Sequence, residues 1–106
     1  MKAIMIYMTA SSMQEAELIA EKLVEQRLCA GVNLFPEVKS IYHWKGNVQR
    51  EKEVALFVQS KENLLSEITA LVKSLHSYDC PAIASFSITG GNPDYLDWIK
   101  NETKQG

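Results

Sequence analysis

Apolar residues recur along this chain with two spacings, one that favours strands and one that favours helices. Residues 3–8 form a continuous apolar run, which is typical of a strand covered on both faces. Ser12 and Glu15 then match the capping-box pattern and predict the start of a helix. The apolar stripe of that helix consists of Ala16, Ile19, Ala20, Leu23, Val24 and Leu28. We expect Gly31 to mark the turn out of this region.

Residues 41–58 are predicted to form a long β-hairpin. Two β-leaning runs flank Lys45-Gly46-Asn47, where glycine or asparagine can take the positive φ of a tight reversal. Ile41 and His43 should face one way and Tyr42 and Trp44 the other, because side chains alternate along a strand. The strand that leads into the hairpin should cover 32–42, with a bulge or an edge position at Pro36, which cannot donate a ladder hydrogen bond.

The last third of the chain predicts a helix, a strand and a further helix. Ser60 is expected to cap the first of these helices, and Pro81 blocks its continuation. The apolar stripe of this helix is Leu64, Leu65, Ile68, Leu71, Val72 and Leu75. Residues 82–88 alternate in part and favour a strand. Asn92 as cap and Pro93 at the first helical position then open a final helix, whose apolar side includes Leu96 and Ile99.

The order strand, helix, strand, strand, helix, strand, helix predicts an α+β fold. It is the ferredoxin-like split βαβ arrangement (βαββαβ) with an extra C-terminal helix and a long β-hairpin. Right-handed crossovers place the first two helices on one face of the sheet. The strands are apolar on both sides, and one short helix is too small to cover the second face. We therefore expect several copies to associate in a closed ring.

Length and charge narrow the class of protein. With 106 residues and 46% hydrophobic content, we expect a single domain spanning residues 1–106. The net charge is −2 and basic residues are interleaved with acidic ones, so we expect no nucleic-acid partner. No apolar run approaches the roughly 18 residues that a membrane span needs, so we also expect no membrane partner and a cytoplasmic location. Cys29 and Cys80 are then expected to be free thiols.

No nucleophile elbow, P-loop, dinucleotide fingerprint or zinc motif is present, so no common enzyme signature is available. The residues able to bind a soft metal ion are Cys29, His43, His76, Cys80, Met5, Met8 and Met13. None has the paired spacing of a metal site, and for each one a structural role in packing is the competing interpretation. Glu53 has two interpretations as well. It belongs to a solvated ribbon, or it turns toward a subunit boundary and joins Trp44, His76 and Tyr78 in a pocket.

Several segments together resemble the CutA family of divalent-cation tolerance proteins. They are Ile41-Tyr42-His43-Trp44-Lys45-Gly46, Glu53-Val54, Leu75-His76-Ser77-Tyr78-Asp79-Cys80-Pro81, Asp94-Tyr95-Leu96-Asp97-Trp98, and Arg27-Leu28-Cys29-Ala30-Gly31-Val32-Asn33. The resemblance covers nearly the whole chain. It implies a cytoplasmic homotrimer of ferredoxin-like subunits, similar in architecture to the P-II signalling proteins. It also implies a role in tolerance to copper and other divalent cations, with no catalytic reaction and no required cofactor.

The resemblance also suggests metal ligands, with departures from the family pattern. His76 matches a copper-binding position of some members, whereas Leu75 stands where a second histidine can occur. The family cysteine falls on Gly31, with Cys29 two residues earlier, and Met8 replaces a cysteine that some members carry. These matches assign a copper or other divalent-cation site to His76, Met8 and Cys29. The alternative is a P-II-like sensor that binds a metabolite between subunits, at Trp44, Glu53 and Tyr78. An RNA-recognition module on the same topology is disfavoured by the acidic charge.

Overall fold

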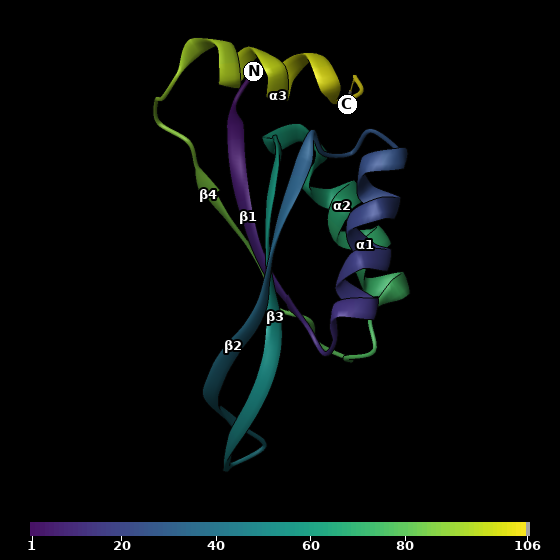
Figure 1. Ribbon diagram of the computed structural model, residues 1–106, viewed down its shortest axis with the longest axis vertical. Coiled ribbons are helices and arrows are strands. Elements are labelled where there is room, and N and C mark those ends of the chain that lie inside the picture. Colours follow the sequence, from purple (N-terminus) through teal and green to yellow (C-terminus); the bar gives the residue numbers. More distant parts are fainter. Residues whose placement is uncertain (106) are drawn as a thin grey trace.

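A four-stranded antiparallel sheet with strand order β2-β3-β1-β4 forms the centre of the molecule (Figure 1). The computed structural model describes residues 1–105. Along the chain the elements are β1 (Ala3–Ala10), α1 (Met13–Glu25), β2 (Gly31–Trp44), β3 (Asn47–Lys61), the 3-10 turn η1 (Glu62–Leu64), α2 (Leu65–Leu75), β4 (Ile83–Ser87) and α3 (Pro93–Glu102). The α+β ferredoxin-like prediction, with its extra C-terminal helix and long hairpin, is therefore confirmed.

One face of the sheet packs against α1 and α2 and makes the core (Figure 1). Alternate strand residues point into this layer because strand side chains have a period of two. The largest fully buried side chains are Ile4, Ile6, Met8, Ile19, Leu23, Leu28, Leu56, Leu64, Ile68, Ile99, Val58 and Val72. Full burial of one such side chain contributes about 1.5–3 kcal/mol to stability. Packing of the strand side chains against α1 and α2 keeps both helices on the same side of the sheet.

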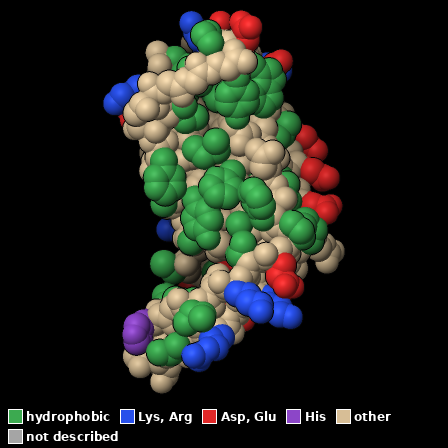
Figure 2. Space-filling model, turned by 60° about the vertical axis from the view of Figure 1, so that its left-hand side comes forward, with side chains coloured by type: hydrophobic (Ala, Val, Ile, Leu, Met, Phe, Trp, Pro, Cys, Tyr) green, Lys and Arg blue, Asp and Glu red, His purple; other side chains and the backbone are tan. Residues whose placement is uncertain are grey.

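The opposite face of the sheet is also apolar. It carries the residues that alternate with the core positions, and we call it the helix-free face: Met5, Tyr7, Phe35, Ala55, Phe57, Ala84 and Phe86. The Phe57 ring lies 5.6 Å from Tyr7 and 5.4 Å from Phe35 between ring centroids. Phe35 and Phe86 keep 49% and 57% of their surface exposed. Figure 2 shows hydrophobic side chains gathered over the middle of the molecule in this way.

Helix α3 covers only one end of the sheet, where it lies across the start of β1 (Figure 1). Its cap is as predicted, because the Asn92 side chain accepts a hydrogen bond from the Asp94 amide at 3.0 Å. A Cβ atom on Gly31 would lie 2.9 Å from the Trp98 ring, so the absence of a side chain there allows the close approach of α3. No helix within residues 1–105 is both long and apolar enough to cross a bilayer.

The β2–β3 hairpin projects beyond the rest of the sheet (Figure 1). Trp44 pairs with Asn47, and the two residues between them have positive φ, 51° at Lys45 and 82° at Gly46. Such a two-residue turn matches the right-handed twist of the flanking strands. A bulge or an edge position was predicted at Pro36, and both are found: the register shifts between Phe35 and Val38, and β2 is an edge strand.

The predicted start of the second helix was wrong. Ser60 does not cap a helix, since it lies within β3 and its buried hydroxyl donates to the Leu28 carbonyl oxygen at 2.6 Å. A 3-10 turn intervenes, and α2 begins at Leu65 without a side-chain cap. Strand β3 extends through Ser60 to Lys61, because the Ser60 hydroxyl is hydrogen-bonded inside the core.

The end of α1 also differs from the prediction. Val24 is exposed rather than buried, and Leu28 reaches the core only after the helix has ended. The reversal is made by Arg27, which has φ of 56°, and its guanidinium pairs with Glu102 at 3.1 Å. Gly31 is already the first residue of β2.

The start of α1 is tied to two neighbouring segments by Glu15. The Ser12 side chain caps the helix by accepting from the Glu15 amide at 3.1 Å. The Glu15 carboxylate accepts from the Ser11 amide at 2.9 Å and from the Ser77 amide at 2.9 Å. Burial raises the pKa of Glu15, but the hydrogen bonds from Ser11 and Ser77 outweigh burial, and the net pKa lies below its ordinary value of 4.5.

We predict that Glu15→Gln lowers the free energy of unfolding by about 1–3 kcal/mol at pH 7, because an amide NH₂ would face a backbone donor. A carboxylate with a depressed pKa in the folded state stabilises the protein fully above the unfolded pKa, and this contribution is lost as pH falls through the folded pKa. The difference between the two proteins should therefore shrink below about pH 4. Urea unfolding at several pH values measures it, with the exposed Glu17→Gln as control. A difference that is constant with pH would contradict this role.

Candidate functional site

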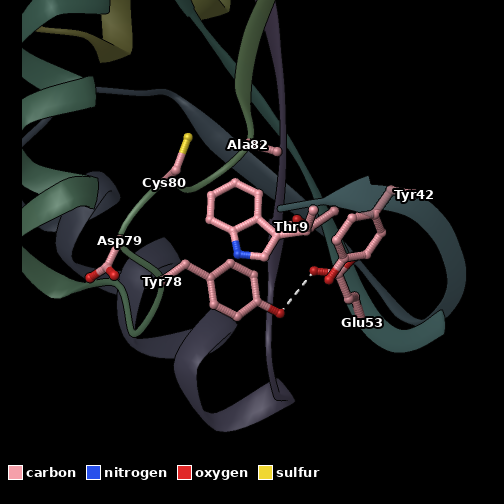
Figure 3. Close-up of a pocket in the computed structure, with 8 residues that line it drawn as sticks. Thr9, Tyr42, Glu53, Tyr78, Asp79, Cys80 and Ala82 are labelled. Atoms are coloured by element: carbon pink, nitrogen blue, oxygen red, sulfur yellow. Dashed lines mark hydrogen bonds between the residues drawn. The ribbon is translucent and has the colours of Figure 1, made fainter. Parts of the chain in front are cut away.

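A cavity of about 340 Å³ opens where the β2–β3 hairpin meets the end of β1 and the loop between α2 and β4. Its lining residues are Thr9, Tyr42, Trp44, Glu53, Tyr78, Asp79, Cys80 and Ala82. They come from all three of these segments, which lie close together only in the folded chain (Figure 3). The volume is in the range of small-molecule sites.

Glu53 and Tyr78 form the polar centre of this cavity. The Tyr78 hydroxyl donates to Glu53 Oε2 at 2.9 Å, and Tyr42 lies on the other side of the carboxylate (Figure 3). Only 7% of Glu53 is exposed. Burial raises the pKa of the Tyr78 hydroxyl, and the hydrogen bond to Glu53 and the Glu53 charge raise it further. The hydroxyl therefore stays protonated and remains a donor at neutral pH.

His76 holds Tyr78 in place through a hydrogen bond and a ring contact. Its Nε2 lies 2.7 Å from the Thr9 carbonyl oxygen, and its Nδ1 accepts from the Tyr78 amide at 3.0 Å. These partners assign the proton to Nε2, because a carbonyl oxygen can only accept and an amide can only donate. The His76 side chain is 1% exposed, and its ring centroid lies 4.6 Å from that of Tyr78. Both ring nitrogens are thus engaged in fixing the loop.

The structure brings together the three residues assigned from sequence to a pocket. Trp44, Glu53 and Tyr78 all line the cavity. His76, also considered for this pocket, packs against Tyr78 instead of lining the cavity. Sequence reasoning did not assign Tyr42, although Tyr42 and Trp44 alternate onto the same strand face, a signal that could have found it.

The three residues assigned to a metal site occupy different surroundings. Met8 lies in the core opposite Leu56, and Cys29 is buried in the connection before β2, outside any strand. Burial raises the pKa of the Cys29 thiol to about 12. Within residues 1–105, no three His, Cys, Asp or Glu side chains gather in the arrangement of a metal site. The assignment of His76, Met8 and Cys29 to copper therefore stays a prediction.

Comparisons with known proteins identify relatives along nearly the whole chain. Protein CutA, chloroplastic, of Arabidopsis thaliana is 35% identical over 102 residues, which cover 96% of this chain and 56% of the relative. The chain thus spans little more than half of that plant relative. The divalent-cation tolerance protein CutA of Archaeoglobus fulgidus is 42% identical over 94 residues, 89% of this chain and 91% of the relative.

Solved structures agree with the sequence relatives. The crystal structure of CutA1 from Oryza sativa superposes with a TM-score of 0.96 at 35% identity, covering 99% of this chain and 96% of that one. The structure described as the periplasmic divalent cation tolerance protein CutA from Archaeoglobus fulgidus gives 0.93 at 37% identity, covering 96% and 99%. The sequence also matches the family described as CutA1 divalent ion tolerance protein over residues 4–102. Since both sequence and fold match over this length, the chain belongs to the CutA1 divalent ion tolerance family.

Proposed function

We propose that this protein acts without catalysis in the response to divalent cations, copper among them, as a homotrimer. Family membership is the observation that carries the role in cation response. The apolar helix-free face supports the assembly into a trimer. The names of its relatives describe tolerance to divalent cations. Tolerance needs a protein that binds or senses an ion, and it does not by itself require a reaction.

The amount of apolar surface on the helix-free face supports assembly. Four aromatic rings, those of Tyr7, Phe35, Phe57 and Phe86, lie on this face of the sheet, and α3 covers only one end. Contiguous apolar surface of this kind marks an interaction site in soluble proteins. The sheet also ends on both sides in strands, β2 and β4, whose outer edges have no strand partner within residues 1–105. A closed ring of copies would cover both the face and the edges.

For the cation, we propose weak copper binding through His76 with Met8 or Cys29. Imidazole, thioether and thiolate are ligands that suit copper(I). Two features of the chain make such binding weak. His76 Nδ1 would have to release the Tyr78 amide, and the Cys29 thiol would have to lose a proton against its raised pKa.

A second candidate function is a small-molecule sensor similar to the P-II proteins. The observation that favours it is the cavity around Trp44, Glu53 and Tyr78, which we propose to lie at a subunit boundary. Thermal-shift measurements with nucleotides and small acids would favour the sensor if a ligand raises the melting temperature.

A cytoplasmic location stays a prediction, and the names of relatives include a chloroplastic and a periplasmic protein.

We predict that the protein sediments at micromolar concentration as a species of about 36 kDa, three copies of the 11.9 kDa chain. Phe86→Glu should shift it to about 12 kDa, because a charge on the helix-free face would be buried between the copies without a partner. Analytical ultracentrifugation measures both masses.

Leu18→Glu is the matched control for this experiment. Leu18 is 43% exposed on α1, which lies on the other side of the sheet, so this variant should keep the mass of the unmodified protein. A folded species of about 12 kDa before any substitution would exclude the trimer.

We predict that His76→Ala weakens copper binding by at least about tenfold, since loss of even an outer-shell partner of a metal site costs about 10–100-fold. Isothermal titration with copper(I) under anaerobic conditions and with copper(II) in air measures the affinities. His43→Ala, at the exposed hairpin tip, serves as the control histidine. Identical affinities for all three proteins would remove His76 from the proposed site.

A further inference from the structure

The cavity described above combines a buried acid with aromatic walls. Glu53 is 7% exposed, and the aromatic rings of Tyr42, Trp44 and Tyr78 line the same space. The other acid of the lining, Asp79, is exposed, and its carboxylate points away from Glu53 (Figure 3). Neither lysine nor arginine belongs to the lining residues. Negative charge and the electron-rich faces of aromatic rings are therefore concentrated around one side chain.

Glu53 lacks a counter-charge of its own. Its hydrogen-bond partner is the neutral Tyr78 hydroxyl, and within residues 1–105 no Lys, Arg or His lies within 4.0 Å of its carboxylate oxygens. A buried carboxylate is normally paired with a cation, because burial removes the water that stabilises its charge. One oxygen is occupied by Tyr78, which leaves acceptor capacity on the carboxylate for a further donor.

The residues that line the cavity suit an organic cation better than a divalent metal ion. A divalent metal ion takes four or more N, O or S ligands, and the described residues supply no cluster of three such side chains here. An organic ammonium or guanidinium ion needs less, namely one carboxylate for hydrogen bonds and aromatic faces for its charged carbon–nitrogen groups. The Trp44 ring already attracts a cation in this way, since Lys45 Nζ lies 5.9 Å from its centroid.

We propose that this pocket binds a small organic cation, an amine or a guanidine, with its charge held between Glu53 and the rings of Tyr42, Trp44 and Tyr78. The Tyr78 hydroxyl orients the carboxylate, and His76 fixes the backbone that carries Tyr78. This ligand class goes beyond tolerance of divalent metal ions. A volume of about 340 Å³ lies at the lower end of the range of small-molecule sites and admits a small amine or guanidine.

Titration of ¹⁵N-labelled full-length protein, in metal-free buffer, tests the proposal. The probes are n-butylammonium, tetramethylammonium and methylguanidinium, with n-butanol as the uncharged match for n-butylammonium. The chain has two tryptophans, so the indole N–H signals of Trp44 and Trp98 report separately. At least one cation should shift the Trp44 signal saturably while Trp98, which packs over Gly31, stays unchanged. n-Butanol should produce no saturable shift.

Glu53→Gln keeps the size of the side chain and an oxygen that can accept from Tyr78, but it removes the charge. It should weaken binding of the cation by about tenfold or more, as expected for loss of a charge-assisted hydrogen bond. Asp79→Asn is the matched control and should change the affinity less than about twofold, as expected for an exposed charge. Lys45→Met should not weaken binding, because it removes only a competing cation.

Three results would overturn the proposal. They are no saturable Trp44 shift with any of the three cations, equal binding of n-butanol and n-butylammonium, or equal affinity of Glu53→Gln and the unmodified protein. Because the titration measures neither subunit mass nor copper affinity, its failure would be distinguishable from failure of the proposed function.

Discussion

An apolar sheet with helices on only one side is the constraint on which the rest of this structure depends. Strand side chains alternate, so a strand apolar at every position sends half of its hydrophobic groups to each face. In β1 and β3 one half packs beneath α1 and α2, while Tyr7 and Phe57 belong to the other half. The chain has only α3 left for that second face, and α3 lies at one end of it (Figure 1). Association of copies is the simplest way to cover the remaining surface.

The hairpin and the pocket follow from the same architecture. Because β2 and β3 continue past the end of β1, their ribbon leaves the sheet carrying Tyr42 and Trp44 toward the loop between α2 and β4. The Tyr78–Glu53 hydrogen bond joins these two segments, and His76 supports it from the core side. Each of these groups is positioned by a neighbour that is itself buried or hydrogen-bonded, so the cavity is a built feature of the fold. Its chemistry favours cations over anions.

Periodicity and capping chemistry were enough to predict the fold, including the bulge at Pro36 and the cap at Asn92, because these signals are local. The errors occurred where a tertiary contact decided the outcome. Ser60 looks like a helix cap, yet its hydroxyl bonds to Leu28, which is distant in sequence. Gly31 looks like a turn, yet it makes room for Trp98. Trp44, Glu53 and Tyr78 could be grouped from sequence. The lack of an ion pair to Glu53 within 4.0 Å among residues 1–105 could not be predicted, since it depends on rotamers and burial.

Hydroxyl-radical footprinting of the protein in solution at micromolar concentration tests the central claim most directly, because it reports the exposure of single side chains. Phe35 and Phe86 are 49% and 57% exposed in the single chain, and Leu18 on α1, at 43%, provides the reference. If the helix-free face is covered by other copies, both phenylalanines should be modified several-fold more slowly than in the denatured chain, while Leu18 reacts at the rate of an exposed residue. Modification of Phe35 and Phe86 at rates that match their exposure in the single chain would contradict the account.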